Sequence, residues 1–465
     1  MRAARLEPLY DYRLWLRALV VVAVLLAAAY LGRKPSPLYL YALLGAGGLV
    51  ALLRWPPLGL LALVAAALLV PFAVGTGTGT SLNAAVLLVP ALLGLATLDM
   101  LKRRDLGALS ARPMLPLALL CVVAVIAFLA GSQPWILFAE TASLASQAGG
   151  LAIFLLSAAA FLLAAHWTRD ERWLQALTWL FIALGAVFVA GRVAEPIGQL
   201  TDRLFQAGAS GSLFWTWLVA LAFGQAAFNQ KLAPILRLAL AGVVAAALYD
   251  SLAGAEAWLS GWLPAVVALV VALVAGAPRL ALPTMAIGAV VGAVNLDRVS
   301  AFLSAGDNAF SLVTRLAAWR IVAEITSASP LIGLGPSNYY FYTPLFPILG
   351  YAVSFNSHNN YVDIAAETGL LGLACFLWLA FAVGWLAWRA RARVPAGFGR
   401  GYLYGAIGGL AGTLAAMGLG DWFIPFVYNI GFTGFRASVL GWIFLGGLVA
   451  LANTYSRRGE SGVRG

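Results

Sequence analysis

The chain has 465 residues, of which 62% are hydrophobic and 10% charged, and its formal net charge is +11. Soluble domains carry roughly 25% charged residues, and disordered chains carry more, so this composition excludes both classes. Two cysteines and two histidines are too few for a disulfide framework or a His-rich metal site. We therefore expect an all-α polytopic membrane protein.

Apolar runs recur along the whole chain. A spanning helix needs about 20 mostly apolar residues, because the hydrocarbon core is roughly 30 Å thick. The runs predict roughly 12–14 transmembrane helices, with those around Arg54 and Arg279 also compatible with re-entrant hairpins. They lie near 14–32, 38–53, 57–74, 82–101, 114–131, 149–167, 173–191, 213–229, 235–250, 258–276, 280–295, 359–387, 402–420 and 437–454.

The loops between these runs alternate in charge. Basic loops such as Lys102–Asp105 and Trp388–Arg400 alternate with loops such as GSQPW and DWFIPFVYN, which hold no basic residue. Short cytoplasmic loops collect Lys and Arg, so we expect both ends of the chain to lie inside. The predicted parts are a transmembrane bundle (1–294), a large outer loop (295–357), C-terminal transmembrane helices (358–454) and a cytoplasmic tail (455–465).

The outer loop contains one helical pattern. In SLVTRLAAWRIVAEITSA (311–328), Arg315 and Trp319 are four residues apart, as are Arg320 and Glu324. This spacing predicts an amphipathic helix that lies on the membrane surface or caps the bundle. The spacing is equally compatible with a solvent-exposed ion pair between Arg320 and Glu324.

A tyrosine-rich turn, PLIGLGPSNYYFY, follows that helix. Tyr339, Tyr340 and Tyr342 fit an aromatic belt at the membrane interface, and stacking on sugar rings is the functional alternative.

The segment FNSHNNYVDIAAETGLLGL carries the densest polar cluster. Ser357 is the predicted N-cap, which places His358 in the first turn of the next span. A helix N-terminus favours anions and lowers an imidazole pKa, so a neutral base is available near pH 7. Asp363 falls one turn after Asn359, which continues the polar stripe into the membrane. The alternative is that His358 is only an interfacial residue.

At these residues the chain resembles the superfamily of O-antigen ligases and O-antigen polymerases, bacterial membrane glycosyltransferases of GT-C-like fold. The family motif is a His, then Asn, Ser or Gln, nine residues, and Gly-x-x-Gly, and it is matched by His358, Asn359, Gly369 and Gly372. The resemblance is specific over about residues 315–373. The family's Ser-Arg-Gly element appears only as Pro-Arg-Leu around Arg279, which the topology places inside and which we interpret as structural.

The resemblance implies transfer of a glycan from undecaprenyl pyrophosphate to a sugar hydroxyl at the outer face of the bacterial inner membrane, without metal or cofactor. It implies a catalytic set of His358, Arg315 and Asn359, with His358 as the base and Arg315 on the leaving pyrophosphate. Arginines on the outer side break the charge bias of the loops and so also suit pyrophosphate. Further candidates for binding the pyrophosphate or a sugar are Arg192, Arg203, Arg320, Asp363 and Tyr339. Of the other cations expected outside, Arg33 and Lys34 suit snorkelling at the membrane surface, and Arg436 begins the last span.

Three functions stay open. A ligase passes the glycan to lipid A–core or a similar surface acceptor, which the single compact loop favours. A polymerase extends another lipid-linked repeat unit, with a chain-length regulator as a possible partner. A transporter or flippase of lipid-linked saccharide would move the donor without consuming it, but we find no convincing inverted repeat.

Overall fold

The computed structural model describes Val22 and residues 37–75, 81–105, 107–109, 111–209, 211–253, 259–294 and 306–461. Over these residues the chain is almost entirely helical, which confirms the predicted all-α class. It divides into two compact units, Met1–Leu58 and Gly59–Gly465. Apart from Val22, the predicted first span at 14–32 lies outside the described residues, as do Arg33 and Lys34.

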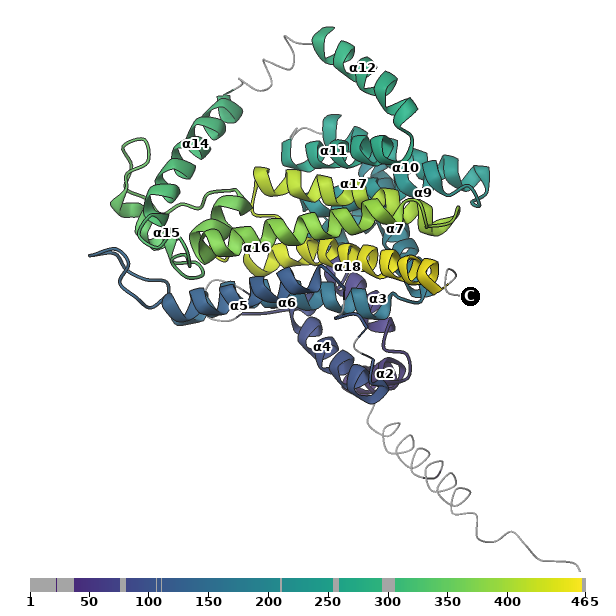
Figure 1. Cartoon of the computed structure of the whole chain (residues 1–465), viewed down its shortest axis with the longest axis horizontal. Helices are drawn as coiled ribbons and strands as arrows, with labels where there is room; N and C mark the ends of the chain where they lie inside the picture. Colours follow the sequence, from purple (N-terminus) through teal and green to yellow (C-terminus); the bar gives the residue numbers. More distant parts are fainter. Residues whose placement is uncertain are drawn as a thin grey trace, which may run out of the picture. The chain divides into compact units, whose positions relative to one another are not determined.

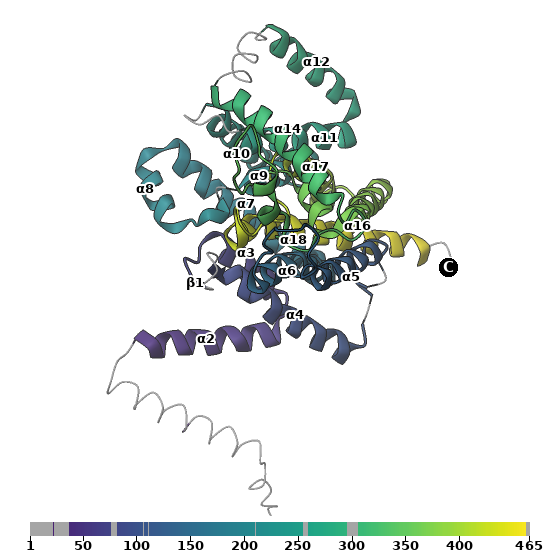
Figure 2. The ribbon, with the colours of Figure 1, turned by 90° about the vertical axis from the view of Figure 1, so that its left-hand side faces the viewer.

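The helices and β1 are labelled in Figures 1 and 2. In chain order they are α2 (Pro37–Arg54), α3 (Leu58–Leu68), β1 (Ala73–Gly75), β2 (Ser81–Asn83), α4 (Ala84–Arg103), α5 (Met114–Ala130), α6 (Leu144–Trp167), α7 (Glu171–Val193), α8 (Glu195–Leu204), the 3-10 turn η1 (Ala207–Ala209), α9 (Ser212–Phe228), α10 (Pro234–Ala253), α11 (Leu259–Gly276), α12 (Pro278–Val294), α14 (Gly306–Thr326), α15 (Tyr339–Tyr342), η2 (Thr343–Leu345), α16 (Asn360–Ala390), α17 (Phe398–Leu419) and α18 (Gly431–Ser461). β1 and β2 pair antiparallel.

Seven helices of the described part are long and apolar enough to cross a membrane: α4, α6, α7, α11, α16, α17 and residues 431–456 of α18. By this measure the number is lower than the roughly 12–14 spans predicted from hydropathy. The difference arises because several apolar runs form shorter helices, among them α3 with 11 residues and α5, α9 and α12 with 17 each. The chain is a multi-pass membrane protein.

Helix α18 is the centre of the second unit. An 18-residue stretch of its spanning part is entirely buried, and the helix contacts α6, α9, α16 and α17. Both ribbon views show α6 and α18 side by side (Figures 1 and 2). Small residues let neighbouring backbones approach: a β-carbon at Gly405 of α17 would meet the carbonyl oxygen of Ala220 of α9 at 2.6 Å. Close backbone approach of this kind is how helices associate in a bilayer.

Helix α16 is interrupted at Gly369, the first glycine of the Gly-x-x-Gly motif. Its backbone there has φ +69° and ψ −177°, a conformation reserved in practice for glycine. The turn at residues 330–335 fills the interruption and replaces the missing helical hydrogen bonds. The bonds run from Leu370 N to Pro330 O (2.8 Å), Leu371 N to Leu331 O (3.2 Å), Leu334 N to Ala366 O (2.9 Å) and Gly335 N to Glu367 O (3.1 Å).

The helix predicted over 311–328 is present as α14. It contacts α15, η2 and α16, so the segment between α14 and α16 folds back onto the start of α16. The fold therefore places the residues just before α16 between α14, the tyrosine-rich turn and the end of α17.

Candidate active site

His358 is the last residue before the cap of α16. Part of the residue's surface is exposed, and its backbone φ is +48°, a left-handed value that is uncommon outside glycine. The N-cap is Asn359, whose side-chain oxygen accepts from the backbone N–H of Tyr361 (2.9 Å) and Val362 (3.4 Å). The prediction of Ser357 as the cap is wrong, because the Ser357 hydroxyl is bonded elsewhere. His358 therefore stands ahead of the first turn of α16 and outside its helical backbone.

Two residues from the loop between α17 and α18 face the His358 ring. Asn429 Nδ2 donates to Asp421 Oδ1 (2.8 Å) and lies 3.5 Å from His358 Nδ1. The second oxygen of Asp421 accepts from Phe426 N (3.0 Å), and Asp421 is 2% exposed. The Nδ1 side of the ring thus faces the protein, whereas within the described residues Nε2 makes no hydrogen bond.

Sequence reasoning missed Asp421 and Asn429. Both lie in the DWFIPFVYN loop, whose lack of basic residues served only to set the topology. The sequence did hold a signal. This loop is rich in aromatic residues, begins with an aspartate and ends with an asparagine, and the predicted topology puts it on the same side of the membrane as His358.

Arg315 of α14 reaches the end of α17. Its Nη1 donates to the carbonyl oxygen of Leu419 (2.9 Å), the last residue of that helix. The side-chain amide of Asn359 lies 3.5 Å from the neighbouring carbonyl of Gly418. A helix C-terminus carries free carbonyl groups and partial negative charge, which suits both donors. The structure therefore brings together His358, Arg315 and Asn359, the three residues predicted to be catalytic.

The charges of this cluster act on one another. Burial lowers the pKa of His358 below its usual value; the Asp421 carboxylate acts in the opposite direction and Arg315 adds to the decrease. Burial raises the pKa of Asp421, and the hydrogen bonds from Phe426 and Asn429 oppose that increase. Burial also lowers the pKa of Arg315, although a guanidinium stays charged. The cluster combines an imidazole whose pKa is lowered with a guanidinium that stays charged.

Asp363 and Tyr339 lie deeper, behind the residue that precedes His358. The Tyr339 hydroxyl donates to Asp363 Oδ1 (2.6 Å) and accepts from Ser357 N (3.1 Å). Tyr339 is 0% exposed, so its ring offers no face to a sugar. One turn beyond Asp363, Glu367 accepts from the backbone of Ser337 (2.7 Å) and is also buried.

The remaining candidates lie on other elements. Arg192 lies in the last turn of α7 and pairs with Asp250 of α10 (3.3 Å), and Arg203 is exposed in the last turn of α8. Arg320 is exposed on α14, and the ion pairs of the described residues do not include one with Glu324. Buried Arg436 donates to the carbonyls of Ala66 and Ala67, near the end of α3, which is a structural role.

Residues 217–377 match the model of a protein family described as O-antigen ligase. Over these residues the chain is similar to the O-antigen ligase family. A comparison with curated proteins finds no match.

The O-antigen ligase match begins within α9 and ends within α16. It includes the three predicted catalytic residues, together with Arg320, Tyr339, Asp363 and both motif glycines. It does not reach Arg192, Arg203 or the DWFIPFVYN loop. The match confirms the resemblance based on the His motif and supports an activity of the O-antigen ligase or polymerase type.

Among the described residues, no group of three or more His, Cys, Asp or Glu side chains is placed to hold a metal ion. The polar groups available around His358 are an imidazole, a guanidinium, a buried carboxyl and amides. Such groups bind hydroxyl and phosphate oxygens directly.

Proposed function

We propose that the chain transfers a glycan from undecaprenyl pyrophosphate to a saccharide hydroxyl, as an O-antigen ligase, at the site around His358. The observation that supports this best is that half-buried Arg315 donates to the last residue of α17, while His358 lies beside Asn429 in the loop that follows that helix. A displacement at an anomeric carbon requires a base for the proton of the attacking hydroxyl and a cation for the charge of the leaving pyrophosphate. A neutral imidazole and a guanidinium meet these two requirements.

The proposed reaction is a single displacement. The imidazole of His358 accepts the proton of the acceptor hydroxyl on its unprotonated nitrogen, while the hydroxyl oxygen forms a bond to the anomeric carbon. The bond from that carbon to the pyrophosphate oxygen breaks, and the pyrophosphate leaves with the electron pair. Arg315 binds the negative charge that develops there, with the N–H groups not engaged by Leu419. Asn429 and Asp421 hold the Nδ1 side of the imidazole.

The donor and the side of the membrane are also proposals. We place the site on the periplasmic face of the inner membrane, because the residues before α16 belong to the loop that the charge bias puts outside. Arg192, Arg203 and Arg320 are proposed as further contacts for the pyrophosphate or a sugar. The acceptor is a saccharide of lipid A–core or a similar glycolipid, and the second candidate is extension of a lipid-linked repeat unit.

The test is a transfer assay on purified protein with lipid-linked oligosaccharide, a panel of acceptors and EDTA. Wild type should consume the donor, and His358→Ala should not. Arg279→Ala, which removes an exposed charge on α12, serves as the control and should retain activity. The identity of the acceptor that becomes extended distinguishes a ligase from a polymerase. Movement of the intact donor across the liposome membrane would refute the proposed enzymatic function and favour a transporter.

A further inference from the structure

The backbone at His358 is held in a conformation that it would not adopt by itself. A φ of +48° brings the β-carbon of an L-residue close to its own carbonyl oxygen, at a cost of roughly 1–2 kcal/mol. Strained residues of this kind persist only where neighbouring groups hold them, and they gather at active sites. The contacts of the residue before His358 show what holds it.

Ser357 is bonded through every polar atom. Its N–H donates to the Tyr339 hydroxyl (3.1 Å), and its carbonyl accepts from Trp319 Nε1 (2.8 Å). Its hydroxyl donates to Asp363 Oδ1 (2.6 Å) and accepts from Asn359 N (3.0 Å). Ser357 is 0% exposed, so no water competes for these bonds. The peptide groups on both sides of His358 are therefore fixed.

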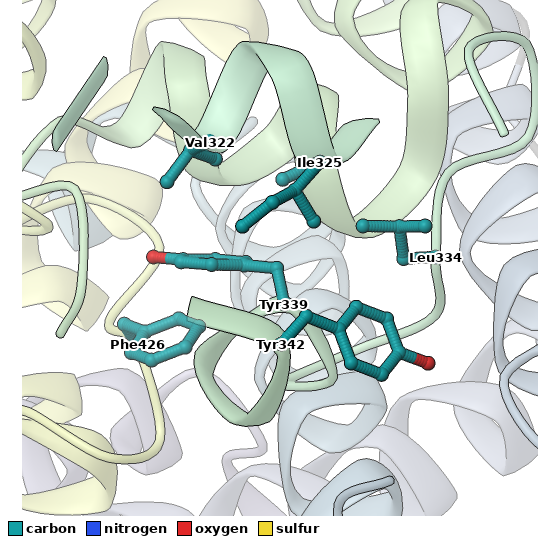
Figure 3. Packing of buried hydrophobic residues seen from close by; sticks show 7 residues of the cluster. Val322, Ile325, Leu334, Tyr339, Tyr342 and Phe426 are labelled. Carbon is teal, nitrogen blue, oxygen red and sulfur yellow. The ribbon is translucent and has the colours of Figure 1, made fainter. Parts of the chain in front are cut away.

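The partners of Ser357 come from three separate elements: Trp319 from α14, Tyr339 from α15 and Asp363 from α16. We call Trp319, Tyr339, Ser357 and Asp363 the Ser357 clamp. Tyr339 packs in a buried cluster with Val322, Ile325, Leu334, Tyr342, Ala366 and Phe426 (Figure 3). The centroids of the Tyr339 and Phe426 rings are 5.0 Å apart. The clamp is thus tied to packed side chains and does not depend on the exposed loop.

We propose that Tyr339 and Asp363 are positioning residues, which hold the His358 backbone through Ser357 so that the imidazole meets the acceptor hydroxyl. This inference rests on the proposed function of His358 as the base. It assigns Tyr339 and Asp363 a different role from the substrate contacts predicted from the sequence, since neither side chain is exposed.

The chain provides a matched pair of variants. Tyr339 and Tyr342 are both fully buried in the same cluster, and Figure 3 shows their hydroxyls pointing in opposite directions. The Tyr339 hydroxyl belongs to the clamp, whereas the Tyr342 hydroxyl has no hydrogen-bond partner in the described residues. Tyr339→Phe and Tyr342→Phe therefore remove the same atom from the same core, and only one of them breaks the clamp.

We expect Tyr339→Phe to lower kcat roughly 10- to 100-fold, as a displacement of about 1 Å does, with little change in the KM for donor or acceptor. Tyr342→Phe should keep kcat within about threefold of wild type. Ser357→Ala should resemble Tyr339→Phe. A rise in KM at constant kcat would instead indicate that Tyr339 contacts the substrate. An equal loss of kcat in both tyrosine variants would indicate that Tyr339 contributes only to the packing of the core. Either result overturns the proposal.

A second readout needs no turnover. Diethylpyrocarbonate modifies neutral imidazole, so the modification rate of His358, measured by mass spectrometry against pH, has its midpoint at the pKa of that ring. The ring is flanked by Asp421 and Arg315, and burial keeps its pKa below 6.5. In Tyr339→Phe and Ser357→Ala the ring becomes free to leave this environment, and the midpoint should rise toward 6.5. Buried His166 in α6 reports any general unfolding in the same samples.

An unchanged midpoint in both clamp variants would refute the positioning role. If wild type consumes no donor with any acceptor, the proposed function fails, while the midpoints still decide whether the clamp holds His358. The two failures are therefore distinguishable.

Discussion

Substituting alanine for Gly369 tests whether the interruption of α16 is required. The φ of +69° with ψ −177° costs a residue with a β-carbon on the order of 1–3 kcal/mol. The new atom would also overlap the carbonyl of Leu331, which cannot withdraw without losing the bond from Leu371 N. Losing that bond costs about 0.5–1.5 kcal/mol, so the total is about 1.5–4.5 kcal/mol.

The control is Gly384→Ala in the same helix. A β-carbon there would meet only Leu410 Cδ2, at an ordinary contact distance of 3.4 Å. Alanine in a helix interior is favoured over glycine by roughly 0.5–1 kcal/mol. Thermal unfolding in detergent should therefore show a clear decrease in melting temperature for Gly369→Ala and none for Gly384→Ala. Equal melting temperatures for the two variants would refute the reasoning.

Four further predictions concern the site itself. The acid limb of a kcat/KM profile should have its midpoint below 6.5, because only the neutral ring accepts a proton and burial lowers the pKa of His358; a midpoint above 6.5 would contradict this. Asp421→Asn should move that midpoint lower still, since the carboxylate raises the pKa of His358, and an unmoved midpoint would show that its charge does not act on the ring. Arg315→Ala should lower kcat about 100-fold or more, with Arg315→Lys losing less, and equal activity of both with wild type would remove Arg315 from the mechanism. Arg192→Ala should raise the donor KM severalfold at constant kcat, whereas an unchanged KM would leave Arg192 as a partner of Asp250 alone.

The sequence was sufficient to predict the helical class, which composition and apolar runs determine. The His motif and the helical pattern around Arg315 also identified residues that the structure brings together, and their role in catalysis stays a prediction. Hydropathy overestimated how many runs form long helices, because an apolar residue does not reveal where a helix ends. The N-cap was misplaced for a related reason: Ser357 and Asn359 are both good caps, and only the fold gives the Ser357 hydroxyl another partner.

The rest of the site depends on contacts between distant parts of the chain. Asp421 and Asn429 carry no local pattern that links them to His358, and their role appears only when the loop after α17 lies against α16. The Gly-x-x-Gly spacing is visible in the sequence, but its partner, the turn at residues 330–335, is not. Burial also decides what a side chain can contact, because Tyr339 has the right chemistry for a sugar and no exposed surface to offer one.

The interruption at Gly369 has a further consequence, which concerns the thickness of the bilayer. An unbroken α16 of 31 residues would be about 46 Å long, well beyond a hydrocarbon core of roughly 30 Å. The part after Gly369, residues 370–390, measures about 32 Å and so matches the core by itself. The turns that carry Asp363 and Glu367 are then left over at the headgroup level. The glycine thereby divides one helix into a lipid-matched rod and a polar cap.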